Sequence, residues 1–125
     1  MKQGGFSAVE LLITLFVAAA FIATGYQLYS IIVKNGGEVR AQAKASNIAY
    51  DNMRRYASLT ATPCVATAAP TPTPTIPAGS GLSNATITVT ISCPYASALS
   101  ISKVQVSVKY NTPQQEVVHA IYVNN

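Results

Sequence analysis

Residues 11–33 read LLITLFVAAAFIATGYQLYSIIV and contain no charged side chain. At about 1.5 Å of rise per residue, a helix of this length covers the roughly 30 Å hydrocarbon core of a bilayer. We therefore predict a membrane-spanning helix. A single carboxylate, Glu10, stands directly before it. Burying an unpaired carboxylate in hydrocarbon costs several kcal/mol, so Glu10 needs an explanation.

The residues before the apolar run form an unusual processing signal. An ordinary signal peptide carries its small-residue cleavage site after the apolar core, whereas here Gly4 and Gly5 precede it. Cleavage at this place would keep the apolar segment in the mature chain. The stretch GGFSAVELLITL, residues 4–15, resembles the amino terminus of type IV pilins and their relatives. In that family a prepilin peptidase cuts after a glycine, phenylalanine commonly follows, and glutamate is fifth in the mature chain; these positions are Gly5, Phe6 and Glu10 here.

The resemblance implies a role for each part of this segment. Residues 1–5 would be a leader peptide, and the new terminal amine of Phe6 would be methylated. Glu10 would pair with the terminal amine of a neighbouring subunit and set its register as subunits leave the bilayer. The alternative is that Glu10, four residues from the new end, simply reaches the membrane surface. The implied partners are the prepilin peptidase, the bacterial cytoplasmic membrane, a pilus assembly platform and other pilins in a homo-oligomeric, extracellular helical filament, with no cofactor.

A second helical pattern follows the apolar run. Residues 35–59 are amphipathic, and we expect residues 6–34 and 35–59 to form the two halves of one long helix. One apolar stripe recurs at spacings of three and four residues and comprises Ala45, Ile48, Ala49, Met53 and Tyr56. Gly36 and Gly37 cost about 1 kcal/mol each relative to alanine inside a helix, so a bend or fray is expected there.

The remainder of the chain predicts a loop and a sheet. Residues 60–82 are rich in proline and threonine, and residues 70–77 in particular should be extended surface chain, either a spacer or a surface for glycan attachment. Residues 83–125 alternate with period two. The inward positions are expected to be Ile87, Val89, Ile91 and Cys93 on one strand and Val104, Val106, Val108 and Tyr110 on the next. The last strand, residues 116–123, is apolar on both faces, which leaves its register open.

These elements define an α+β fold in which a long helix packs on a small three-stranded antiparallel sheet. Cys64 and Cys93 are expected to form a disulfide in an oxidising compartment. This bond would close a loop of about 30 residues and stabilise the folded domain by on the order of 3 to 4 kcal/mol. A metal site is the weaker alternative, because His119 is the only histidine available to two thiolates. We expect no metal site.

Charge and composition argue against two classes of function, nucleic-acid binding and catalysis. The net charge of +4 over 125 residues is spread along the chain rather than gathered in a basic patch with stacking aromatics, so no specific nucleic acid is expected. No nucleophile, base or phosphate loop has a recognisable setting, and we expect no catalytic residue. Basic residues are enriched on the cytoplasmic side of membrane spans. Lys2 alone precedes this span, whereas Lys34, Arg40 and Lys44 follow it, so this rule by itself would place the domain in the cytoplasm. The cysteines, the Pro-Thr segment and the leader motif favour the outside, which we adopt.

Three functions remain. The first is a structural subunit, major or minor, of a type IV pilus. The second is a pseudopilin of a type II secretion system, whose major members typically bind calcium in a carboxyl-terminal loop; beyond Asp51 this chain has Glu116 as its one carboxylate residue. The third is a pilin-like binding module for adhesion or DNA uptake, anchored by the same helix.

Overall fold

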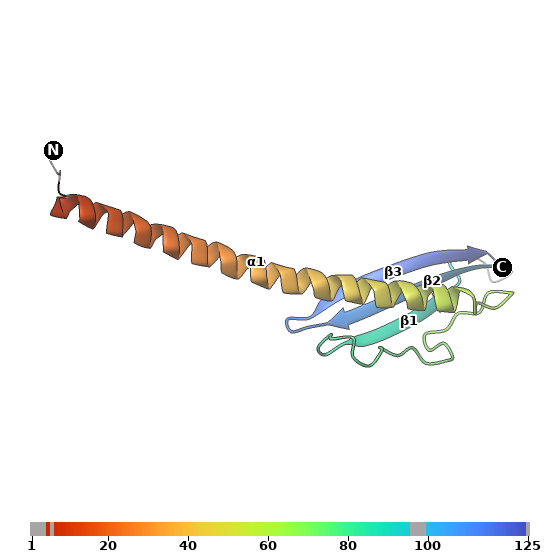
Figure 1. Cartoon of the computed structure of the whole chain (residues 1–125). Helices are drawn as coiled ribbons and strands as arrows, with labels where there is room; N and C mark the ends of the chain where they lie inside the picture. Colours follow the sequence, from red (N-terminus) through yellow and green to blue (C-terminus); the bar gives the residue numbers. More distant parts are fainter. Residues whose placement is uncertain (1–4, 6, 96–99, 125) are drawn as a thin grey trace. The chain divides into compact units, whose positions relative to one another are not determined.

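The computed structural model describes residue 5 and residues 7–95 and 100–124. Helix α1 (Ala8–Ala57) is followed by strands β1 (Thr86–Ser92), β2 (Ile101–Tyr110) and β3 (Gln115–Asn124), as Figure 1 shows. A long helix packed on a three-stranded antiparallel sheet confirms the predicted α+β fold class. The chain divides into two compact units, residues 1–38 and residues 39–125.

The part of α1 in the first unit is apolar, and its side chains are exposed in the isolated chain. The helix is long and apolar enough to span a membrane. Its threonine and serine hydroxyls are satisfied locally, because Thr14, Thr24 and Ser30 each donate to a backbone carbonyl three or four residues earlier, at 2.8 to 3.0 Å. Since these hydroxyls bond within the helix, they add little to the cost of placing it in hydrocarbon.

The predicted stripe of the second helical half packs on the sheet. Ala45, Ala49, Met53 and Tyr56 are buried, and Ile48 is partly buried against them. The helix continues through Gly36 and Gly37 without a break, so the expected bend or fray is not seen as an interruption. The boundary between the two units nevertheless follows directly after these glycines, at residues 38 and 39. The helix ends at Ala57, where the predicted helical segment extended to Leu59.

The sheet is a meander with β2 in the centre. The inward side chains of β1 and β2 are those predicted, with Val89, Ile91 and the four predicted residues of β2 buried, while Ile87 and Cys93 are partly buried. The register that the sequence left open is set by pairing with β2: Val117 lies opposite Val108, and His119 lies opposite Val106. The same pairing puts Val118, Ala120 and Tyr122 on the outer face, where they are exposed.

The two edges of the sheet differ. Thr67 in the preceding loop exchanges both backbone hydrogen bonds with Ile91 of β1, at 2.8 and 2.9 Å. The backbone N–H and C=O of Ile91 therefore point away from β2. In an antiparallel sheet, successive residues along a strand point their backbone groups alternately to the strand on one side and to the strand on the other. The direction at Ile91 thus gives the direction at every other residue of the sheet. At β3, this alternation directs the backbone groups of Val118, Ala120 and Tyr122 to the open edge of the sheet.

The Pro/Thr-rich loop is fixed to the sheet and helix at several points rather than hanging free. Pro70 is buried, and the Tyr56 hydroxyl at the end of α1 donates to the Pro72 carbonyl oxygen. Together with the pairing of Thr67 and Ile91, these contacts make the segment a wrapping loop. Most of residues 71–79 are exposed, in agreement with the expected surface location.

Candidate functional site

The start of α1 carries a reciprocal pair of hydrogen bonds. The Ser7 Oγ accepts from the Glu10 backbone N–H, with an N···O distance of 3.2 Å. The Glu10 Oε2 accepts in turn from the Ser7 backbone N–H at 3.4 Å. The first helical hydrogen bond, from Leu11 N–H to the Ser7 carbonyl, follows at 3.1 Å. This arrangement is a capping box, which satisfies two backbone donors that the first turn of a helix leaves without partners.

The capping box changes the interpretation of Glu10. Within its own chain, the Glu10 carboxylate already has one hydrogen-bond partner, which the sequence-based interpretation did not include. The signal was present as SAVE, residues 7–10, which has the Ser-x-x-Glu spacing of a capping box. It was missed because the apolar run and the glycine junction drew the interpretation toward a partner in another subunit.

The stabilisation that the capping box provides can be compared with the free-energy cost of burying the Glu10 carboxylate. A capping hydrogen bond contributes about 0.5 to 2 kcal/mol, and a negative charge at a helix amino terminus about 0.3 to 1 kcal/mol. The effective penalty for taking a carboxylate out of water is several kcal/mol. The cap alone therefore does not offset full burial of Glu10. The carboxylate must either stay in contact with water at the membrane surface or find a second, charged partner once it is buried.

The proposed cleavage junction lies just before this cap. Gly5 is exposed and non-helical, and Ser7 is likewise exposed and precedes the helix. Phe6, the residue expected to form the new terminus, lies outside the described residues. Gly5 therefore lies before the described helix, which begins at Ala8.

The far end of the apolar stretch carries aromatic and basic side chains. Tyr26, Tyr29 and Lys34 line one shallow hollow on the surface of α1, and both tyrosines are exposed. From Glu10 to Tyr29 the helix rises about 28 Å at about 1.5 Å per residue, close to the thickness of a bilayer core. Tyrosine and lysine are the side chains favoured at the boundary between lipid and water. The spacing thus matches a span with Glu10 at one boundary and Tyr29 near the other.

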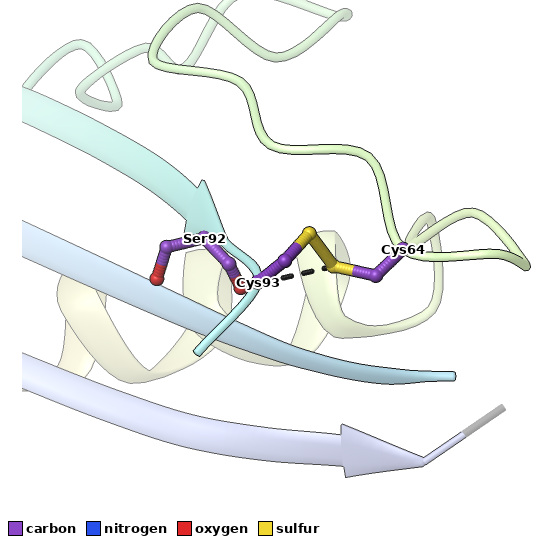
Figure 2. The surroundings of a disulfide bond; sticks show 3 residues. All are labelled: Cys64, Ser92 and Cys93. Atoms are coloured by element: carbon purple, nitrogen blue, oxygen red, sulfur yellow. Dashed lines mark hydrogen bonds between the residues drawn. A yellow bond between two sulfur atoms is a disulfide. The ribbon is translucent and has the colours of Figure 1, made fainter. Parts of the chain in front are cut away.

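The predicted disulfide between Cys64 and Cys93 is confirmed. Cys64 and Cys93 are bridged with their Cα atoms 5.9 Å apart (Figure 2). The Cys64 Sγ also lies 3.9 Å from the Ser92 carbonyl oxygen; an oxidised sulfur has no hydrogen to donate, so this is a packing contact. Thr67 is held against Ile91 a few residues further along the loop. The bridge and this backbone pair together fix the beginning of the loop to the end of β1.

His119 has a structural contact that the sequence did not reveal. Its Nε2 lies 2.9 Å from the Ser46 Oγ, which connects β3 to α1 across a partly buried interface. The strand pattern predicts a partly exposed residue at this position, and the intermediate exposure of His119 agrees with that. Ser46 and His119 are far apart in sequence, so only the folded chain identifies the pair.

Comparisons of the chain with protein-family models, with curated proteins and with solved structures give no match. The resemblance to type IV pilins accordingly rests on residues 4–34 and, beyond them, on the layout of helix, loop and sheet.

Proposed function

We propose that this chain is a structural subunit of a type IV pilus filament, held in the bacterial cytoplasmic membrane by residues 6–34 until it is assembled. The observation that carries the proposal is the order of features at the amino terminus. A glycine junction at Gly5 is followed by a capped Glu10 and then by an uncharged helix of membrane-spanning length. Each feature occurs alone in other proteins, but the combination suits a precursor that is cleaved before its apolar helix.

Cleavage after Gly5 creates the second partner that Glu10 needs. The new amine of Phe6 is positively charged, and a carboxylate paired with an ammonium group in apolar surroundings makes a strong charge-assisted hydrogen bond. Subunits whose helices pack side by side remove Glu10 from water, and an unpaired charge would then cost several kcal/mol. The pairing of Glu10 with the amine of the next subunit therefore favours one register over all others.

The second unit provides the outer part of the proposed subunit. Its sheet is covered by α1 on one face, and its loop is fixed by a disulfide that forms in an oxidising compartment. These features support an extracytoplasmic domain. Precursor insertion with the second unit outside and Gly5 on the cytoplasmic side follows from this placement.

The test is to change Glu10 in two ways. Glu10→Gln keeps the side-chain shape and the capping box, since glutamine also serves at this position, but removes the charge. Glu10→Ala removes both. We expect both variants to enter the membrane and to be cleaved after Gly5, yet to give at least tenfold less sheared filament per membrane-held subunit, because losing a buried charge pair costs at least about 1.4 kcal/mol.

Glu38→Gln is the matched control, because Glu38 is an exposed acid on the same helix. It should assemble normally. Normal filament yield from Glu10→Gln would show that the charge serves no contact between subunits, and the proposal would fail.

A further inference from the structure

The edge of β1 that faces away from β2 leaves backbone groups without partners. Ile87 and Val89 share the backbone direction of Ile91, so their N–H and C=O groups point to this edge. No hydrogen bond to these groups is found within residue 5 and residues 7–95 and 100–124, and Val89 is only 1% exposed. A buried backbone N–H or C=O without a partner is costly, so this edge favours any segment that can pair with it.

A hollow of about 400 Å³ lies along the same edge, with β1 as one wall and the Pro/Thr-rich loop as the other. Its lining includes Ala69 and Thr71 of the loop, which runs beside β1 (Figure 1). The loop pairs with β1 at Thr67 and then turns away, because the Ala69 N–H donates to the Thr67 Oγ1 at 3.2 Å. The pairing therefore stops one step before Val89.

The order of residues in the loop suits continued pairing. Two residues on from the pair with Ile91, Ala69 falls opposite Val89. Two residues further, Thr71 falls opposite Ile87. The prolines of this stretch then all fall on the alternate positions, which point away from β1: Pro70, Pro72 and Pro74. Proline is tolerated on an edge strand in that orientation, and it favours an extended backbone in the residue before it.

We infer that residues 69–71 are a strap with two states, the open state described above and a closed state in which they pair with β1 as a fourth strand. Closing forms four backbone hydrogen bonds, two with Val89 and two with Ile87, and breaks the bond from Ala69 to the Thr67 hydroxyl. This hydroxyl competes with the Val89 C=O for one N–H and so holds the strap open.

The closed strap would protect the sheet from pairing with other chains. An open strand edge is a template for strand addition, whereas an edge strand with outward-facing prolines offers few N–H groups to a further strand. The strap lies within the second unit, and its closing does not depend on the proposed function.

The test changes the Thr67 side chain in the full-length chain, held in detergent micelles. Thr67→Val keeps the branched shape but removes the acceptor of the Ala69 N–H, whereas Thr67→Ser keeps that acceptor and is the matched control. The measurement is amide hydrogen exchange by NMR at Thr71, which is exposed and whose N–H has no hydrogen bond in the described part of the chain. Thr73 is exposed, lies beyond the strap and serves as the internal reference.

Loss of one hydrogen bond typically changes an equilibrium constant about fivefold, so Thr67→Val should slow exchange at Thr71 roughly fivefold. Exchange at Thr73, and all exchange in Thr67→Ser, should stay within about twofold of the unchanged chain. The nuclear Overhauser effect between the Hα atoms of residues 70 and 88, which the closed register brings opposite each other, should strengthen in Thr67→Val.

A second pair of variants, made in the Thr67→Val background, tests the register. Ala69→Pro removes the N–H that the closed state needs and should abolish the slowing at Thr71. Ala68→Pro places proline at a position that points away from β1 and should retain the slowing.

Unchanged exchange at Thr71 in Thr67→Val would overturn the strap. Slowing that survives Ala69→Pro would overturn it as well, because something other than residues 69–71 would then cover the edge. Slowing that appears only when the chain is concentrated would do the same, since it would identify a second copy of the chain as the segment that pairs with β1.

Discussion

Ser102→Ala is expected to stabilise the second unit, although it removes a polar group from a strand. Ser102 is fully buried on β2, opposite Val123 of β3. Its hydroxyl has no hydrogen-bond partner within the part of the chain that the structure describes. A buried hydroxyl left in this state costs about 1 to 3 kcal/mol, because its hydrogen bonds to water are lost and not replaced.

Two smaller effects oppose the gain. Removing one oxygen atom leaves a space of roughly 10 to 20 Å³, which at about 24 cal/mol per Å³ costs about 0.2 to 0.5 kcal/mol. Alanine is also a poorer strand residue, on a scale that spans about 1 kcal/mol in total. The removal of the unsatisfied hydroxyl outweighs both, and a net stabilisation of about 1 kcal/mol remains.

The assay is urea and thermal unfolding of the fragment comprising residues 39–125, which forms one compact unit. A gain of about 1 kcal/mol should raise Tm by roughly 4 to 8 °C for a domain of this size, with the urea m-value unchanged. Ser107→Ala is the control, because the Ser107 hydroxyl on the outer face donates to the Glu116 carboxylate and its loss should destabilise slightly. A destabilisation of 1 kcal/mol or more by Ser102→Ala would show that the Ser102 hydroxyl is satisfied in solution and would refute the reasoning.

The disulfide between Cys64 and Cys93 closes a loop with a sequence separation of 29. Its reduction, or the change of both cysteines to serine, should therefore destabilise the same fragment by about 3 to 4 kcal/mol. The expected decrease in Tm is roughly 15 to 25 °C. Two freely alkylated thiols in the unreduced, denatured protein would contradict it. Amide hydrogen exchange along β3 should alternate, with Val118, Ala120 and Tyr122 fast at the open edge and Val117, His119 and Ile121 slow against β2. Uniform protection of all six amides would mean that the edge is covered.

The sequence predicted the elements whose signal is periodic. The three- and four-residue spacing of Ala45, Ala49, Met53 and Tyr56 identified the face of α1 that is buried, because a helix buries one stripe. Strict alternation did the same for β1 and β2. The register of β3 was not predictable in this way, since its residues are apolar on both faces and only the pairing with β2 selects Val117 over Val118.

Contacts between residues far apart in the sequence could not be predicted from local sequence patterns. The pairing of Thr67 with Ile91 and the bond between Ser46 and His119 join segments that no spacing connects. Composition alone placed the proline-rich loop on the surface, but it could not show where the loop is fixed. The Ser7 cap differs from these cases, because its Ser-x-x-Glu signal is local and could have been recognised from the sequence.

The central claim, that this chain is a processed filament subunit, is tested most directly by the intact mass of the protein in filaments sheared from cells that make it. A single species that begins at Phe6 with a methylated amine, and that holds one disulfide, is the expected result. A chain that retains residues 1–5, a chain cleaved after Ala20 inside the apolar run, or filaments that lack this protein would contradict the claim.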